Sequence, residues 1–448
     1  MTKTLKSIDS PLPDEKKRGA LPWIIWGCGG LFYFYQFIIR ASPSYMTEEL
    51  MQSFQVHGLA LGALVSFYYY AYAPMQIPLG LLLDRFGSRR VLITSCSLCI
   101  LGSMMFASSH TLTIACAGRF LMGVGSAGAW IGSLKLATLW FPADRMGVII
   151  GATMFLGTMG PFFGGPLLAN LVNYAGWRQA MYLLGAIGTL LVIFMWVFLS
   201  DRSPDSPSVS AEAQPPESIL KSLQKVFFVR QVWINAAFAM LMYVPIAAFA
   251  DLWGVTFIQD LYHVEKPLAA SVISCVYFGM SMGAFVSAYF SDRIGSRRLP
   301  MMIGVIGSLI TYSLIIYMPG ISLTIMYGLT FLTGFFFTGQ LMCFASAVEM
   351  VPVSSSGVVV GFTNMVVMLS GVIFQPFVGW LLDSSRRMAQ DAPLHSSIYT
   401  LQDWRFSLTS IVICLVIALF LVIFIKETHP KMGVLHKHGK LKTKWKEC

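Results

Sequence analysis

Long apolar runs, separated by short polar or charged breaks, fill almost the whole chain. The first run, from Leu21 to Ser44, is too long for the apolar core of a signal peptide, so we expect a retained helix. Eleven more runs lie roughly at 58–83, 91–109, 112–139, 146–171, 179–199, 231–258, 267–291, 299–317, 321–347, 356–381 and 405–425. Because a backbone amide in hydrocarbon must be satisfied within its own segment, this pattern predicts twelve transmembrane helices.

Composition agrees with that pattern and excludes other classes of protein. Of the 448 residues, 56% are hydrophobic and 12% are charged. A soluble globular protein carries about 25% charged residues, roughly twice as many. This balance excludes a soluble enzyme, a nucleic-acid-binding module and a disordered chain. We therefore expect an all-α, multi-pass membrane protein whose surroundings are a lipid bilayer, with no nucleic acid as a partner.

The 31 Lys and Arg residues are distributed unevenly between the two sides of the predicted membrane. Twenty-three fall in the two tails and in breaks that follow even-numbered helices, five lie on the opposite side, and three lie within the spans. Since cytoplasmic loops hold the excess of Lys and Arg, both termini are predicted to be cytoplasmic. The short loops favour the inner membrane of a bacterium.

A heptapeptide is repeated at matching places along the chain. The segment 84–90 (DRFGSRR) recurs at 292–298 (DRIGSRR), each time after the second predicted helix of its half. The long polar segment 200–217 separates the halves, and two repeats around a midplane site are typical of transporters. The predicted parts are a cytoplasmic N-tail at 1–20, a six-helix bundle at 21–199, a cytoplasmic linker at 200–230, a second six-helix bundle at 231–426 and a basic cytoplasmic C-tail at 427–448.

Three motifs carry a resemblance to the major facilitator superfamily. They are the loop 80–90 (GLLLDRFGSRR), the fourth-helix pattern 118–125 (GRFLMGVG) and the fifth-helix Gly/Pro pattern 157–165 (GTMGPFFGG). The resemblance implies two pseudo-symmetric six-helix bundles, alternating access and one site between the halves. It also implies a conformational latch that holds the outward-open state, made by Asp84, Arg85 and Arg89 with their repeats Asp292, Arg293 and Arg297. The alternative for this cluster is a positive-inside charge group that only fixes topology.

Two narrower resemblances concern the first helices. The stretch 32–46 together with the tyrosines at 68–70 is similar to the bacterial phagosomal-transporter subfamily of amino-acid importers. The position of Arg40 resembles the first-helix Arg of the organic anion/cation symporters. Those symporters carry an acid before that Arg and another after the fourth-helix Arg, where this chain has Ile39 and Ser126.

Arginines inside the spans are candidates for substrate binding, because a charge in the membrane usually faces a partner or a water-filled cavity. Tyr33, Gln36 and Arg40 share one face of the first helix, which predicts a cavity lining. The alternative is that Arg40 snorkels to the outer interface. Arg119 lies near the midplane of the fourth helix, where it either contacts the ligand or has a structural role. Lys135 lies near the cytoplasmic face and is expected to be interfacial.

Polar residues on the later helices complete the predicted site. Asp251 lies well inside the seventh helix and is the candidate for proton coupling, since coupling needs a group that changes charge in the membrane. An ion pair with a cavity Arg and a simple vestibule charge are its alternatives. Gln340 and Asn364 are candidates for substrate binding or for hydrogen bonds to a neighbouring helix.

This inventory of charges predicts the function. Two guanidiniums suit a carboxylate and Asp251 suits a proton or an ammonium group, so we expect a proton-coupled symporter that takes up a small carboxylate-bearing solute: an amino acid, a short peptide or an organic anion. The alternatives are a proton-driven exporter or antiporter of drugs or metabolites, including carboxylate siderophores, and a non-transporting receptor. We expect a monomer with no cofactor or metal. We expect no enzymatic activity, because the spans hold no Ser/His, His/Glu or paired-carboxylate constellation.

Overall fold

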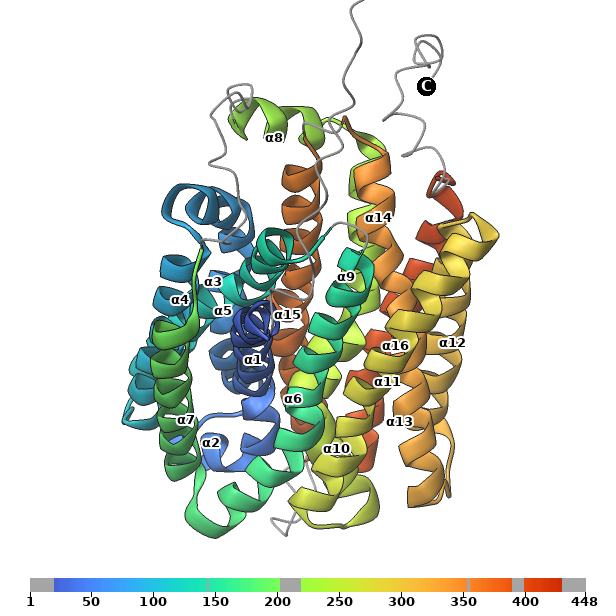
Figure 1. The fold of residues 1–448 in the computed structure, drawn as a ribbon. Helices are drawn as coiled ribbons and strands as arrows, with labels where there is room; N and C mark the ends of the chain where they lie inside the picture. The colour runs from blue at the N-terminus through green and yellow to red at the C-terminus, as the bar shows by residue number, and fades with distance from the viewer. Residues whose placement is uncertain (1–19, 143–144, 202–218, 353–354, 389–398, 429–448) are drawn as a thin grey trace, which may run out of the picture.

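The computed structural model describes residues 20–142, 145–201, 219–352, 355–388 and 399–428. Every regular element in these ranges is a helix, and the long helices run side by side along one axis (Figure 1). The predicted all-α membrane fold of two six-helix bundles is confirmed. Most of the two predicted tails and of the predicted linker lies outside the described residues.

Among the elements described in the first half are seven α-helices and a short 3₁₀ turn. The helices are α1 (Leu21–Ala41), α2 (Thr47–Phe54), α3 (Gly58–Phe86), α4 (Ser88–Ala107), α5 (Leu112–Trp140), α6 (Met146–Ala175) and α7 (Trp177–Phe198), with the turn η2 (Ser42–Tyr45) after α1. The short helix α2 was not predicted. It meets α3 at a bend of 110°. Among the described residues, eleven helices are each long and apolar enough to cross a membrane, and α2 with α3 forms a twelfth span if the bent pair is taken as one.

The second half begins with α8 (Ile219–Phe227), a short helix that was also not predicted. The elements that follow are α9 (Arg230–Val244), η4 (Pro245–Trp253), α10 (Gly254–Tyr262), α11 (Lys266–Ile294), α12 (Arg298–Tyr317), α13 (Leu323–Phe337), η5 (Thr338–Leu341), α14 (Met342–Glu349), α15 (Ser356–Met388) and α16 (Leu401–Phe424). The predicted seventh span is thus one rod, α9–η4–α10, and the predicted tenth is α13–η5–α14.

Two of these rods are irregular where they carry candidate site residues. The seventh changes to a π-helix at Pro245, and this stretch contains Asp251. The tenth tightens to a 3₁₀ turn that contains Gln340. Proline removes a backbone donor, and short π or 3₁₀ stretches often mark functional sites in long helices. The irregular turns therefore contain two of the residues that the sequence analysis assigns to the site, Asp251 and Gln340.

Glycines in the fourth-helix motif bring α5 against α3. A Cβ on Gly123 would lie 2.1 Å from the carbonyl oxygen of Tyr68, so this position admits only glycine. The same arrangement recurs in the second half, where a Cβ on Gly334 of α13 would lie 1.8 Å from the carbonyl oxygen of Val276 on α11. Close helix contact through small residues is the usual packing in membranes. It fixes the faces of α3 and α11 that point toward the other half.

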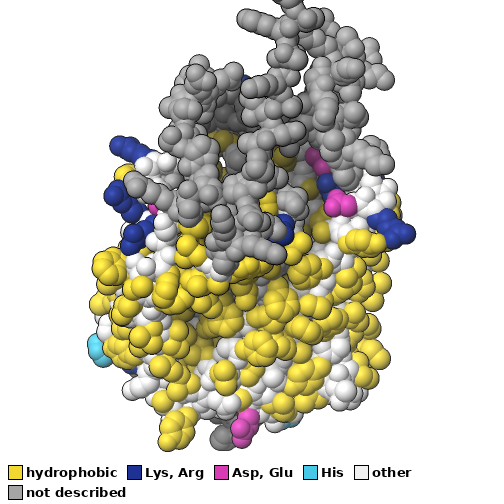
Figure 2. Space-filling view, in the orientation of Figure 1, with side chains coloured by type: hydrophobic (Ala, Val, Ile, Leu, Met, Phe, Trp, Pro, Cys, Tyr) yellow, Lys and Arg dark blue, Asp and Glu magenta, His cyan; other side chains and the backbone are white. Residues whose placement is uncertain are grey.

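The surface agrees with the predicted orientation. Hydrophobic side chains form a broad belt, and Lys and Arg gather toward the end where α8 lies (Figures 1 and 2). We call this end cytoplasmic, following the distribution of Lys and Arg. The two halves meet chiefly through α3 against α15 and α6 against α11. Each of these pairs joins the second span of one half to the fifth span of the other.

Candidate substrate site between the halves

A cavity of about 1380 Å³ lies between the two halves. Its lining runs from Arg40 on α1 to Asp84, Gly147 and Ser356, which lie at the cytoplasmic ends of α3, α6 and α15. The cavity therefore opens toward the cytoplasm, and the structure is inward-open.

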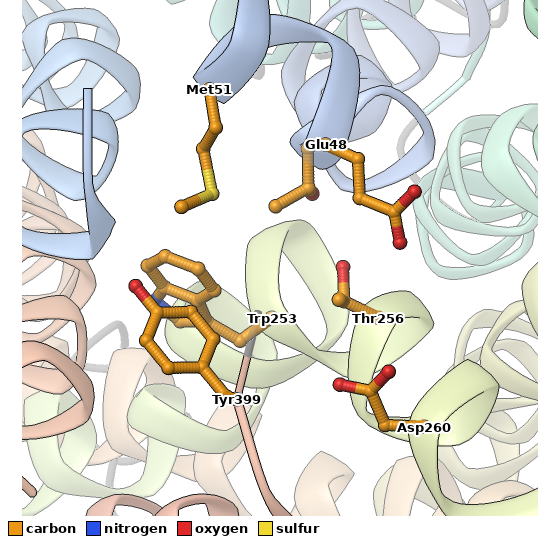
Figure 3. A pocket seen from close by; sticks show the side chains of 7 residues that line it. Glu48, Met51, Trp253, Thr256, Asp260 and Tyr399 are labelled. Atoms are coloured by element: carbon orange, nitrogen blue, oxygen red, sulfur yellow. The ribbon is translucent and has the colours of Figure 1, made fainter. Parts of the chain in front are cut away.

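The outer end of the seam between the halves is closed. Glu48 and Met51 on α2 face Trp253, Thr256 and Asp260 of the second half across a pocket of only about 10 Å³, room for about one water molecule (Figure 3). Lys266 forms an ion pair with Glu49 in the same region.

A second contact closes the outer seam at the start of α3. The carboxylate of Asp383 on α15 accepts hydrogen bonds from the backbone amides of Gly58 and Leu59, both at 2.9 Å. Tyr399 donates to the same carboxylate at 2.7 Å, and burial together with the Asp383 carboxylate raises the pKa of its phenol. An acid of the second half thus caps the first turn of a helix of the first half.

The ion pair of Arg40 and Asp251 joins the halves beside the cavity. The guanidinium Nε lies 3.1 Å from the Asp251 carboxylate, which is fully buried. Tyr69 of α3 donates to this carboxylate at 2.7 Å and Tyr277 of α11 at 2.5 Å. Two hydroxyl donors, one from each half, and the Arg40 cation thus surround one buried carboxylate.

Arg40 also has donor capacity that Asp251 does not use. It lines the cavity, and its Nε and Nη2 are buried with no hydrogen-bond partner among the described residues. Its guanidinium carbon lies 4.1 Å from the centre of the Phe37 ring and 6.0 Å from that of Tyr243. A guanidinium with a free edge, held between aromatic rings, can accept a carboxylate.

Arg119 is placed differently. It is fully buried and is not among the described residues that line the cavity. Its guanidinium donates to the carbonyl oxygens of Ile39 at 3.1 Å, Arg40 at 3.5 Å and Val65 at 3.4 Å. The first two are among the last four carbonyls of α1, which lack partners within the helix. Of the two predicted roles, this geometry favours the structural one, a cap on α1 behind Arg40.

The predicted first-helix face is divided between the cavity and the helix packing. Tyr33 and Arg40 line the cavity, whereas Gln36 is buried and accepts a hydrogen bond from Tyr68 at 2.9 Å. On the other helices, Gln340 and Asn364 both line the cavity. Asn364 donates to Gln76 across the seam at 2.8 Å, and Gln340 has a buried amide nitrogen without a partner among the described residues.

Several residues of this site were missed by the sequence analysis. Tyr69 lay in a run of tyrosines that was noted, but Tyr277, Tyr243 and Gln76 are single polar residues in apolar helices. Aromatic packing is the usual role of such tyrosines, so the hydrogen bonds of Tyr69 and Tyr277 and the contact of Tyr243 with Arg40 become visible only when the helices are placed.

The predicted latch residues make contacts within their own halves. Asp84 pairs with Lys135 at 2.8 Å, and the Arg89 side chain donates to the carbonyl oxygen of Trp196 at 2.7 Å. In the second half, Arg297 pairs with Asp292 at 2.9 Å and Glu349 at 3.0 Å.

The remaining two latch arginines lie beside aromatic rings. Arg85 lies over the ring of Phe86 and Arg293 over that of Tyr289. In the part of the chain that the structure describes, the six predicted latch residues thus make no contact across the seam, and their role in the outward-open state stays a prediction.

Comparison with known proteins agrees with this architecture. The chain is 26% identical over 316 residues to the protein named "Probable sulfoacetate transporter SauU" of Cupriavidus necator, covering 66% of this chain and 72% of that protein. It is 21% identical over 408 residues to the "Probable galactarate/D-glucarate transporter GudP" of Escherichia coli, covering 83% and 89%.

Solved structures show the same fold. A bacterial homologue of the human lysosomal transporter Spinster, in an inward-facing and unoccupied conformation, superposes with a TM-score of 0.71 at 16% identity, over 91% of this chain and 97% of that one. The nucleoside transporter NupG superposes with a TM-score of 0.67 at 15% identity, over 90% of this chain and 98% of that one.

A family model assigns the chain directly. The model of the Major Facilitator Superfamily matches residues 25–373 and 252–447. With the helical fold, the apolar belt and the bacterial relatives, this makes the chain a multi-pass membrane transporter of the kind found in bacterial inner membranes. The chain belongs to the Major Facilitator Superfamily.

Proposed function

We propose that this protein takes up a small carboxylate-bearing solute together with a proton, by alternating access around the Arg40–Asp251 pair. The observation that carries the proposal is the pair itself, a buried ion pair between the halves with an unused guanidinium nitrogen beside an inward-open cavity. Because Arg40 lines the cavity, an anion in the cavity would meet its guanidinium, and the partner of Arg40 is a carboxylate.

The proposed coupling follows from charge neutrality in a low-dielectric site. Protonation of Asp251 removes its negative charge and leaves the Arg40 cation uncompensated, which is costly. A substrate carboxylate at Arg40 restores the balance, so proton and anion each favour the binding of the other. After both leave to the cytoplasm, the ion pair re-forms. Tyr69 and Tyr277 keep Asp251 in place in both protonation states, since their hydroxyls can donate or accept.

Two of the relatives support the chemical class of the solute. The SauU and GudP proteins are named for organic anions, sulfoacetate and galactarate or glucarate. The amino acids and short peptides that the sequence analysis also allowed bring an ammonium group, which would need a second acid. Among the described residues that line the cavity, the one acidic residue is Asp84 at the mouth. We therefore favour an organic anion.

Uptake into proteoliposomes tests the proposal. A panel of labelled organic acids is offered with and without an inward proton gradient. Arg40→Gln is expected to abolish uptake of the transported acid. Asp251→Asn is expected to remove the stimulation by the gradient, while anion exchange at equal pH continues.

Arg178→Gln is the matched control, because Arg178 donates to the carbonyl oxygen of Ser109 away from the cavity and its variant should transport as wild type. Wild-type uptake by Arg40→Gln would exclude the proposed site. Stimulation by an outward gradient instead of an inward one would indicate an antiporter.

A further inference from the structure

We infer that the solute is a monoanion whose carboxylate is attached to an aromatic or flat apolar body, and that dianions are disfavoured. This inference rests on the proposed function and narrows it to a class of acid that differs from the dianions for which SauU and GudP are named. Two features of the cavity lead to it, its charge and its aromatic walls.

The cavity offers one positive charge. The charged side chains among its described lining residues are Arg40 at the closed end and Asp84 at the mouth. The other basic residues of the region are occupied elsewhere, since Lys135 pairs with Asp84 and Arg119 is bonded to three carbonyls behind α1. A second carboxylate on the solute would lose hydration without gaining a cation.

Aromatic rings flank the guanidinium from both halves. On the first half, the centres of the Trp130 and Tyr33 rings are 5.1 Å apart and those of Tyr33 and Phe37 are 4.9 Å apart. On the second half, the rings of Tyr243 and Phe337 are 5.6 Å apart. All five residues line the cavity, and both Phe37 and Tyr243 approach Arg40. Such walls suit a ring that stacks or meets them edge-on.

The polar groups on these walls are side-chain amides and the hydroxyls of Tyr33, Tyr72, Tyr243 and Ser356. The amides of Gln76 and Asn364 are bonded to each other across the seam. The Gln340 amide nitrogen is a buried donor without a partner among the described residues. A ring substituent that accepts a hydrogen bond would pair with this amide.

Binding to the purified full-length protein tests the inference. Phenylacetate is compared by calorimetry with 1,4-phenylenediacetate, which adds a second carboxylate to the same body, with phenylacetamide, which lacks the charge, and with glucarate and choline. Phenylacetate is expected to bind at least about tenfold more tightly than each of the others, a difference of about 1.4 kcal/mol. Equal or tighter binding of either dianion would overturn the inference.

Variants separate the aromatic walls from general stability. Trp130→Leu should weaken phenylacetate by about tenfold and hexanoate by less, whereas Trp130→Phe should restore most of the affinity because a ring remains. The matched control is Trp196→Leu, since that side chain is 65% exposed on the outside of the bundle. Unchanged phenylacetate affinity in Trp130→Leu would contradict the role of the aromatic wall.

The two proposals fail in different ways. If glucarate binds in wild type and not in Arg40→Gln, while phenylacetate does not bind, the choice of solute is wrong and the proposed anion site stands. If no acid binds in a way that depends on Arg40, the proposed function fails as well. Tight binding of choline would overturn both, because the aromatic walls would then serve a cation.

Discussion

The helix pair α3 and α15 is tightly packed at its outer end and open at its cytoplasmic end. At the outer end, a Cβ on Gly62 would lie 2.4 Å from the carbonyl oxygen of Gln375, and one on Gly379 would lie 2.1 Å from that of Gly58. At the cytoplasmic end, a Cβ on Gly80 or Gly357 would meet nothing within 4 Å. One pair of rigid helices thus has both a closed and an open end, as expected if the halves rock as bodies.

The polar contacts at the two ends differ in the same way. At the outer end, Asp383 of the second half caps the first turn of α3 in the first half. At the cytoplasmic end, Asp84, near the end of α3, pairs with Lys135 in its own half. Among these contacts of the described residues, the carboxylate that reaches across the seam lies at the outer end, which indicates that the outer contacts stabilise this conformation. Breaking contacts at either end should therefore move the balance between inward-open and outward-open states in a defined direction.

The largest effect is expected from Gly62→Ala. The added methyl group would press on the backbone of α15 at Gln375 and Pro376, and separation of the outer ends relieves that contact. Overpacking of this kind costs about 1–3 kcal/mol, so we expect a shift toward outward-open of about fivefold to 150-fold. The readout is labelling of Thr256→Cys, in the closed outer pocket, by an impermeant maleimide.

Gly80→Ala is the control for this prediction, because it adds the same methyl group to the same helix at the open end. It should leave the labelling unchanged. Equal labelling in Gly62→Ala and wild type would show that the outer glycines do not set the conformational balance.

A smaller shift in the same direction is expected from Asp383→Asn. The variant keeps the shape of the side chain and loses the charge that strengthens the bonds to the amides of Gly58 and Leu59. The loss is about 1–2 kcal/mol, or roughly tenfold in the ratio of the two states. Labelling of Thr256→Cys measures it again.

Asp403→Asn is the matched control, since Asp403 caps α16 through Thr400 within the second half. Its variant should lower the melting temperature without increasing the labelling. If both variants increase the labelling equally, the cap on α3 has no special role in closing the outer seam.

The unequal success of the sequence analysis has a physical cause. Spans, halves and topology follow from apolar length, repeats and the positions of Lys and Arg, which are local properties of the chain, and the structure agrees on them. Arg40 and Asp251 were found because a charge in a span is conspicuous. Their contact was one alternative among several, because it depends on how two halves meet, and no periodicity within one helix contains that information.

The outer cap shows the same limit. Asp383 lies at the end of an apolar run and is not part of the repeated DRxGSRR segment, so the sequence gives no reason to select it as a contact between the halves. Its partners are backbone amides of α3, which have no sequence signature. The unexpected helix α2 has a similar explanation, since its eight residues are too few to give a clear apolar period.

The smallest effect is expected from Asp84→Asn at the open end, and its direction is the opposite one. Asp84 is 66% exposed and its ion pair with Lys135 is worth little, so the inward-open state should keep its stability. The resemblance to the superfamily predicts that Asp84 latches the outward-open state. Its loss should then shift the balance a few-fold further toward inward-open, seen as faster labelling of Gly357→Cys at the cavity mouth.

Lys135→Gln removes the same ion pair but leaves the carboxylate free to cross the seam, so it should not produce this shift. If both variants label as wild type, the repeated loop fixes topology only, and the outer end alone controls which way the carrier opens.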